Sequence, residues 1–146
     1  MPSSKRLSTA RYFEPYRYPR SLRVIVADDE RDTVLTLAMI LNDEGHEVQG
    51  VYTGSRVLPL VRELDPDVVL LDIALPEQNG YELAEQIRKR PRGKRVLLIG
   101  ISGQYKQDSD KILADLKGFD HYLVKPFAPA ALVALLAPLT FPDAGR

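Results

Sequence analysis

Residues 22–30 of the 146-residue chain read LRVIVADDE, and this stretch decides the fold. A short apolar run, rich in β-branched residues, leads directly into three acidic residues. Two later runs have the same character: VVLL at residues 68–71 precedes Asp72, and VLLIGI at residues 96–101 precedes Ser102. Short apolar runs without polar alternation are typical of strands buried on both faces, as in a parallel sheet covered by helices.

The segments around these runs complete a regular alternation of strands and helices. Residues 47–51 and 119–124 mix polar with apolar residues, which predicts strands at the two edges of the sheet. Apolar residues recur on one helical face within residues 30–44, and Gly45 is suited to follow the end of that helix. The remaining helices are expected at residues 55–64, 79–90, 107–116 and 129–136.

Five strand–helix repeats with right-handed crossovers predict a three-layer, doubly wound α/β domain built on a five-stranded parallel sheet. This domain is expected to occupy residues 22–140, followed by a short tail at residues 141–146. Residues 1–21 form a basic arm with no helical or strand periodicity. Its cluster of aromatic residues at 12–18 leaves two alternatives open, a flexible arm or one that is ordered by packing.

Composition excludes several classes of function. Hydrophobic residues make up 45% and charged residues 27% of the chain, an ordinary globular balance. The absence of cysteine excludes disulfides, zinc–thiolate sites and thiol nucleophiles, and the two histidines, His46 and His121, lack metal-ligand spacing. No apolar run approaches the ~20 residues of a membrane-spanning helix, and none follows the basic N-terminus as in a signal peptide. We therefore expect a cytoplasmic protein that does not enter a membrane.

The net charge of zero is unevenly distributed. Residues 1–22 hold five basic residues against Glu14, a net charge of +4, so residues 23–146 carry −4. A mildly acidic balance argues against nucleic-acid binding by the folded part, because such proteins usually present a basic face.

The residues that follow the predicted strands should meet, because parallel strands end at the same edge of a sheet. They are Asp28, Asp29, Glu30, Asp72, Ser102 and Lys125. Each alone has a structural explanation, such as a charge at a helix N-terminus or a turn residue. Together, carboxylates at an assumed ~5 Å and an effective dielectric of ~20 repel by about 3 kcal/mol per pair, which favours proton uptake or cation binding. Oxygen ligands favour Mg²⁺, and a lysine with a hydroxyl suits a phosphoryl group on an aspartate.

These elements resemble the receiver domains of two-component response regulators. The resemblance covers about residues 22–137 and rests on the motifs Val26-Ala27-Asp28-Asp29-Glu30, Asp72 with Pro76 and Gly80, Ser102, and Tyr122 with Lys125-Pro126-Phe127. It implies a flavodoxin-like sheet with strand order 2-1-3-4-5. It also implies a phosphorelay protein that receives a phosphoryl group from a histidine kinase or a histidine phosphotransfer protein, and that is not an enzyme beyond its own phosphorylation and dephosphorylation.

The resemblance assigns a role to each matching residue. Asp72 would be the phosphoacceptor, Asp29 a direct Mg²⁺ ligand, Asp28 a ligand chiefly through water, and Ala74 a ligand through its backbone carbonyl. Lys125 would pair with the phosphoryl oxygens, and its bond to Pro126 would be cis.

Two further residues would respond to the phosphoryl group. Ser102 would donate a hydrogen bond to it, and Tyr122 would change rotamer, although a plain core aromatic is the alternative for Tyr122. Ser102 and Gly103 stand at positions where receiver domains more often have threonine and alanine, respectively. Ala74 and Gln104 flank the route by which water would reach a phosphoaspartate, so the lifetime of the phosphorylated state stays open.

Two other functions compete with this interpretation. A haloacid dehalogenase-type hydrolase would need a second aspartate two residues after the nucleophile, where this chain has Ala74. An interaction module that acts independently of phosphorylation would keep the fold but would not need the full set of acidic residues and Lys125. About twenty residues follow Pro126, too few for a DNA-binding domain, and the start at Met1 favours a stand-alone regulator that does not bind DNA directly.

The last helix predicts a partner surface. No charged residue occurs between Pro126 and Pro142, although one helix face should meet solvent. Leu132, Val133 and Leu136 can face the sheet, whereas Ala130, Ala134 and Ala137 line another side. The first helix likewise places Leu35 and Met39 outside its sheet-facing set. We expect a homodimer contact through the first and last helices, with an alanine-rich but unpartnered surface as the alternative.

Overall fold

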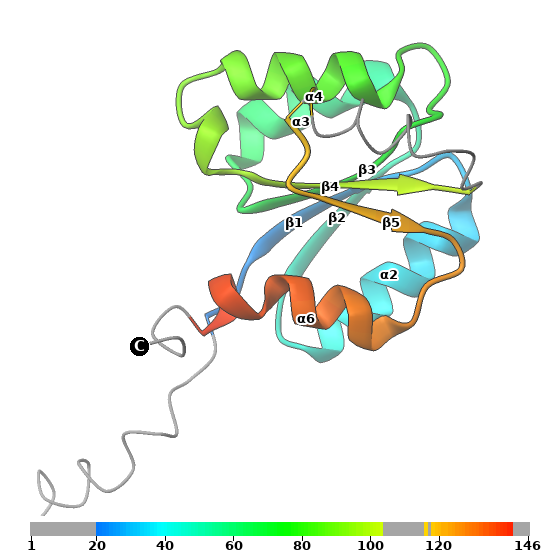
Figure 1. The fold of residues 1–146 in the computed structure, drawn as a ribbon, viewed down its shortest axis with the longest axis vertical. Coiled ribbons are helices and arrows are strands. Elements are labelled where there is room, and N and C mark those ends of the chain that lie inside the picture. Colours follow the sequence, from blue (N-terminus) through cyan, green and yellow to red (C-terminus); the bar gives the residue numbers. More distant parts are fainter. Residues whose placement is uncertain (1–19, 104–115, 117, 142–146) are drawn as a thin grey trace, which may run out of the picture.

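The computed structural model describes residues 20–103, 116 and 118–141. Three predicted segments lie outside these residues: the arm, the tail and the helix expected at residues 107–116. The exceptions are Arg20 and Ser21 of the arm, Leu116 of the helix and Phe141 of the tail. The described residues form an α/β domain (Figure 1). In chain order its elements are β1 (Arg23–Ala27), α2 (Arg31–Asp43), β2 (Glu47–Val51), η1 (Gly54–Arg56), α3 (Val57–Leu64), β3 (Val68–Asp72), α4 (Gly80–Lys89), η2 (Gly93–Arg95), β4 (Leu97–Ser102), β5 (His121–Val124) and α6 (Pro129–Thr140).

All five strands are parallel and lie in the order β2-β1-β3-β4-β5, which confirms the predicted sheet and its two edge strands. The register aligns the ends of the three inner strands, because Ala27 pairs with Leu71 and Leu71 pairs with Gly100. The loops that follow β1, β3 and β4 therefore start side by side.

Helices cover both faces of the sheet. Figure 1 shows α2 and α6 on one face and α3 and α4 on the other. Alternate residues of β1 point to opposite layers: Val24 and Val26 join the core under α2 and α6, while Ile25 and Ala27 join the core under α3 and α4. All five residues of β3 are buried, as expected for an apolar strand between two helical layers.

Local sequence signals set the ends of two helices. The side chain of Asn79 accepts a hydrogen bond of 2.9 Å from the backbone N–H of Glu82, so Asn79 caps α4 as predicted. A Cβ atom at Gly80 would lie 2.7 Å from Ile73 Cα, so only glycine lets α4 start this close to the end of β3. Gly45 follows α2 with φ of +91°, which is the left-handed conformation expected after a helix end.

Three predicted boundaries were wrong: those of the helix expected at residues 55–64, of the last strand and of the last helix. The helix expected at residues 55–64 divides into η1 and α3, which places Pro59 in the first turn of α3, where a backbone N–H has no helical partner. The last strand begins at His121 rather than Phe119, because the Asp120 side chain instead accepts a hydrogen bond from Leu98 N–H.

The last helix continues past Leu136 to Thr140 and contains Pro138. Its final turn is held by the Thr140 hydroxyl, which donates to the carbonyl of Leu136 at 3.0 Å, and by Phe141 N–H, which donates to Ala137 at 2.8 Å. A proline near a helix end removes one hydrogen bond without ending the helix when such contacts remain. Within the described residues, no helix combines the length and apolar character needed to cross a membrane.

Candidate functional site

Two carboxylates are fixed by backbone hydrogen bonds at the ends of the inner strands. Asp28 follows β1 and is fully buried, and its Oδ1 accepts a hydrogen bond of 2.9 Å from Glu30 N–H. Asp72 ends β3 and is 5% exposed, and its Oδ1 accepts a hydrogen bond of 2.9 Å from Ala74 N–H. In both cases a turn that starts directly after the strand aims a backbone donor at the carboxylate and orients it.

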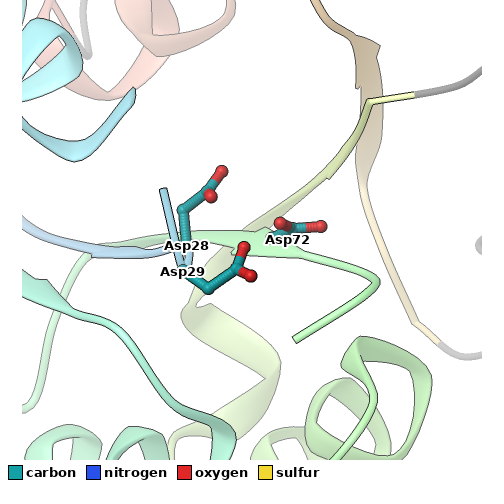
Figure 2. A group of neighbouring side chains, drawn as sticks. All are labelled: Asp28, Asp29 and Asp72. Carbon is teal, nitrogen blue, oxygen red and sulfur yellow. The ribbon is translucent and has the colours of Figure 1, made fainter. Parts of the chain in front are cut away.

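Asp29 completes an acidic cluster. Figure 2 shows Asp28, Asp29 and Asp72 gathered at the ends of β1 and β3. Each offers one carboxylate oxygen, and these three atoms lie within 4.8 Å of one another. Asp29 is exposed, whereas the other two are buried. The predicted convergence of the three acidic side chains is therefore present in the fold.

Lys125 lies against this cluster from the end of β5. Its Nζ is 2.6 Å from Asp28 Oδ2, 2.8 Å from Glu30 Oε1 and 3.8 Å from Asp72 Oδ2. The backbone N–H of Lys125 donates to the carbonyl of Ser102 at 2.8 Å, which ties the loop to the end of β4. The peptide bond between Lys125 and Pro126 is cis, as the resemblance implies.

The surroundings shift the pKa values of these groups in opposite directions. Burial raises the pKa of Asp72 from 3.8 to about 6, and the charges of Asp28 and Asp29 add to the rise, whereas the Ala74 hydrogen bond and Lys125 oppose it. Burial lowers the pKa of Lys125, but its contacts with Asp28 and Glu30 outweigh burial and leave the pKa raised. The hydrogen bond with Lys125 and its positive charge lower the pKa of Glu30.

Five of the seven predicted site residues line one open hollow. This hollow, of about 370 Å³, is lined by Asp29, Glu30, Asp72, Ala74, Ser102, Gly103 and Lys125. Asp28 is not part of the lining, but it forms an ion pair with Lys125, which is. Tyr122 is half-buried on β5 and packs against the core under α3 and α4, and it does not belong to the lining. Gln104 lies outside the described residues.

Glu30 was expected at this edge of the sheet, but no role was predicted for it. Its carboxylate holds Lys125 at 2.8 Å, although the two residues are 95 positions apart in the chain. In the sequence, Glu30 is the last of three acidic residues that lead into a helix. Its direct contact with Lys125 depends on the side-chain conformations of both residues, which the spacing of motifs does not determine.

The donor set of the cluster fits a hard divalent cation. All of the side-chain donors are carboxylate oxygens, which Mg²⁺ prefers over nitrogen and sulfur ligands. Oδ2 of Asp28 is buried and accepts no hydrogen bond of good geometry from the described residues, so its only polar contact there is the ion pair with Lys125. A buried carboxylate oxygen in this situation is suited to a cation or to a water molecule bound to one.

The fold and this hollow define a doubly wound α/β domain with a carboxylate cluster and a lysine at the carboxyl edge of its parallel sheet. The family model of the response regulator receiver domain matches residues 24–137, which is most of the chain. The chain therefore belongs to the response regulator receiver domain family.

Solved structures of this family have the same fold. A CheY-like response regulator receiver domain protein from Methanospirillum hungatei is 27% identical, with a TM-score of 0.74 over 83% of this chain and 94% of its own. The BeF3-activated receiver domain of Klebsiella pneumoniae RstA is 25% identical, with a TM-score of 0.73 over 81% of this chain and 97% of its own. The receiver domain of a sensor histidine kinase from Pseudomonas aeruginosa, with a magnesium ion in its active-site cleft, is 25% identical, with a TM-score of 0.73 over 81% and 96%.

Proposed function

We propose that this chain is a phosphorelay response regulator whose Asp72 accepts a phosphoryl group from a histidine kinase or a histidine phosphotransfer protein. The observation that carries the proposal is the placement of Asp72, which is buried at the end of β3 between two other carboxylates and the ammonium group of Lys125. Membership of the receiver family supports the signalling role.

Asp28, Asp29 and Asp72, together with the carbonyl of Ala74, are the groups that would hold Mg²⁺. The bound ion would supply positive charge beside the phosphoryl oxygens. The magnesium ion in the cleft of the Pseudomonas aeruginosa receiver domain supports this assignment. Among the described residues, the positive charge that pairs with Asp72 is that of Lys125, whose Nζ lies 3.8 Å from Asp72 Oδ2.

The chemical step is an in-line displacement at phosphorus. An Oδ atom of Asp72 attacks the phosphoryl group of a donor phosphohistidine, so a P–O bond forms while the P–N bond breaks. The electron pair of the broken bond stays on the histidine nitrogen, and no oxidant or further reactant is needed. Later hydrolysis of the acyl phosphate returns Asp72 to its carboxylate form and releases inorganic phosphate.

Lys125 and Ser102 would hold the transferred group from the other side of the hollow. Lys125 already lies 3.8 Å from Asp72 and can exchange its contact with Glu30 for a phosphoryl oxygen. Ser102 lines the same hollow and offers a hydroxyl donor. Tyr122, half-buried on the neighbouring strand, is the aromatic side chain proposed to change rotamer when Ser102 moves.

The test of the proposal is phosphorylation by a small phosphodonor or by a phosphorylated kinase. We expect acid-labile label on the wild-type protein in Mg²⁺, and none on Asp72→Asn or in EDTA. Asp43→Asn, which removes an exposed carboxylate at the end of α2, serves as the matched control and should be labelled normally. Labelling of Asp72→Asn equal to wild type would refute the assignment of Asp72, whereas a wild type that takes no label would favour the alternative function, a receiver-fold interaction module that acts independently of phosphorylation.

We also propose a homodimer contact through α2 and α6. Leu35 is 59% exposed and Met39 is 68% exposed on α2, and Ala130 and Ala134 are exposed on α6. A mostly apolar hollow of about 410 Å³ lies where α2 meets the loop before α6. Small and apolar side chains on both helices support close helix approach, and receiver domains often dimerise near these elements.

Sedimentation of the wild type and of Ala134→Glu at micromolar concentration tests this contact, with phosphotransfer assayed in parallel. We expect the wild type to sediment as a dimer and the variant as a monomer, because a buried unpaired carboxylate destabilises an interface. A strictly monomeric wild type, with a variant that receives phosphate at the normal rate, would leave the surface without a role.

A further inference from the structure

Glu30 occupies the N-cap position of α2, but its side chain does not serve that helix. An N-cap side chain usually accepts a hydrogen bond from a backbone N–H two or three positions on, and Asp, Asn, Ser and Thr are preferred there. Among the described residues, the Glu30 side chain makes no such hydrogen bond, and Asp32 supplies an acidic charge in the first turn. Capping therefore does not explain why a glutamate stands at this position.

The carboxylate of Glu30 instead reaches a residue of another element. Its Oε1 accepts a hydrogen bond of 2.8 Å from Nζ of Lys125, which directly follows β5. Both side chains line the open hollow that also contains Asp72. The contact therefore joins the start of α2 to the end of β5 at the rim of the candidate site.

The ammonium group of Lys125 is shared unequally among three carboxylates. Nζ lies 2.6 Å from Asp28 Oδ2 and 2.8 Å from Glu30 Oε1, but 3.8 Å from Asp72 Oδ2. The last distance is beyond the length of a hydrogen bond. Asp28 and Glu30 therefore hold the ammonium group where it is close to Asp72 but does not hydrogen-bond to it.

The two short contacts of Lys125 differ in what their loss would cost. Asp28 is fully buried, and a buried carboxylate that loses its partner is strongly destabilising. The side chain of Glu30 is 65% exposed, so water can replace the ammonium group there at little cost. When a new anionic group is attached to Asp72, the contact with Glu30 is the one that Lys125 gives up most easily.

We propose that Glu30 is a positioning residue, which competes with a phosphoryl group on Asp72 for the ammonium group of Lys125. The inference rests on the proposed function and gives Glu30 a part in it. Before transfer, Glu30 holds Lys125. After transfer, Lys125 turns to a phosphoryl oxygen and the Glu30 carboxylate is hydrated, with no change in covalent bonds or protons beyond those of the transfer itself. Glu30 thereby weakens the phosphorylated state.

The same contact should favour cation binding in the unphosphorylated chain. Glu30 adds negative charge to the hollow and keeps the ammonium group from approaching Asp72. Without that charge, the nearest carboxylates to Lys125 among the described residues are Asp28 and Asp72, so the ammonium group competes more strongly with a cation. Loss of the Glu30 charge should thus weaken cation binding and strengthen binding of a phosphoryl mimic, whereas a merely structural role would weaken both.

Glu30→Gln in the full chain tests the competition. Glutamine keeps the size of the side chain and the backbone N–H that donates to Asp28, but it removes the charge. Calorimetry measures Mg²⁺ binding, and fluorine NMR measures binding of beryllofluoride, a stable mimic of the phosphoryl group, at saturating Mg²⁺. We expect the variant to bind Mg²⁺ about two- to fivefold more weakly and beryllofluoride about two- to fivefold more tightly than wild type, the range of an exposed ion pair.

Two controls separate this contact from a general effect of charge. Asp32→Asn removes an exposed carboxylate two positions away that, within the part of the chain that the structure describes, forms no ion pair with Lys125. It should change both affinities by less than about 1.5-fold, because solvent screens exposed charges. In a Lys125→Ala background, Glu30→Gln should change the beryllofluoride affinity no more than Asp32→Asn does, because the group for which Glu30 competes is gone.

The outcomes distinguish this inference from the proposed function. If the wild type binds beryllofluoride but Glu30→Gln binds it equally or more weakly, the role of Glu30 is overturned and the phosphoacceptor assignment stands. An unchanged affinity for Mg²⁺, or an equal gain in beryllofluoride affinity with Asp32→Asn or in the Lys125→Ala background, would also overturn it. A wild type that takes neither beryllofluoride nor phosphoryl label would overturn both.

Discussion

Replacement of Asp72 by asparagine should stabilise the fold when no cation is present. Asp72 is 5% exposed, and burial together with the charges of Asp28 and Asp29 raises its pKa to about 6. Asparagine has nearly the same shape and can keep the hydrogen bond from Ala74 N–H, but it has no charge to bury. The variant therefore removes an unfavourable charge without opening a cavity.

The size of the effect follows from linkage between protonation and folding. A carboxyl group whose pKa rises on folding binds its proton more tightly in the folded chain, so its ionised form destabilises the fold above the folded pKa. The rise from 3.8 to about 6 corresponds to about 3 kcal/mol at 1.36 kcal/mol per pKa unit. At about pH 7, above both pKa values, Asp72→Asn should be about 2–3 kcal/mol more stable than wild type, and near pH 4 the difference should fall below about 1 kcal/mol.

Urea unfolding in EDTA, followed by circular dichroism between about pH 4 and 8, measures this difference. His46 and the other titrating groups are common to both proteins, so their contributions cancel in the comparison. Saturating Mg²⁺ should then stabilise the wild type more than the variant, because only the wild type has all three carboxylates to bind it.

Asp43→Asn, an exposed carboxylate on α2, is the control and should change the unfolding free energy little. An Asp72→Asn protein that is less stable than wild type at about pH 7, or a difference that does not shrink toward pH 4, would refute the reasoning. It would mean that the hydrogen bond from Ala74 and the charge of Lys125 outweigh the burial of the carboxylate.

Three further predictions concern Lys125, Ser102 and His46. Lys125→Ala should impair phosphotransfer or the structural response to it, which stopped-flow labelling and tyrosine fluorescence can separate. A normal rate with a normal response would exclude its role. Ser102→Ala removes a hydrogen bond worth about 0.5–1.5 kcal/mol, or up to ~3 to a charged group, and should accept phosphate but show a smaller spectral change than wild type. Burial lowers the pKa of His46, and its Nδ1 accepts a hydrogen bond from Leu22 N–H, so stability should fall as pH falls below the usual histidine value near 6.5. His46→Gln should flatten this part of the stability curve, and an unchanged slope would contradict the assignment.

The sequence predicted the sheet, the strand order and the acidic cluster because these follow from strong, separated signals. Apolar runs identify the inner strands, and the ends of parallel strands must share an edge. Boundaries were less accurate. Phe119 and Asp120 look like strand residues, but Asp120 uses its side chain to bind Leu98 N–H and Arg88, and this contact exists only after the chain has folded.

Contacts between distant side chains could not be predicted in this way. Lys125 donates a hydrogen bond to Glu30, which lies 95 positions earlier in the chain. Arg20 and Arg95, at the opposite edge of the sheet, are also far apart in the chain and line one hollow beside Asp67. Motif spacing places such residues at one edge of the sheet, but it does not say which side chains touch. Tyr122 shows the same limit, since its strand was predicted but its packing beside the hollow rather than in its lining was not.

The distances around Lys125 indicate why Asp72 would be the reactive carboxylate. Nζ lies 2.6 Å from the fully buried Asp28 and 2.8 Å from Glu30, but 3.8 Å from Asp72. The positive charge of Lys125 therefore offsets the charge of Asp28 more directly than that of Asp72. Of these two buried carboxylates, Asp72 keeps the less compensated charge. Asp72 also lines the open hollow, whereas Asp28 does not. A bound cation would thus offset the most unfavourable charge at Asp72, so the carboxylate with the most strongly raised pKa is the one that would gain most from cation binding.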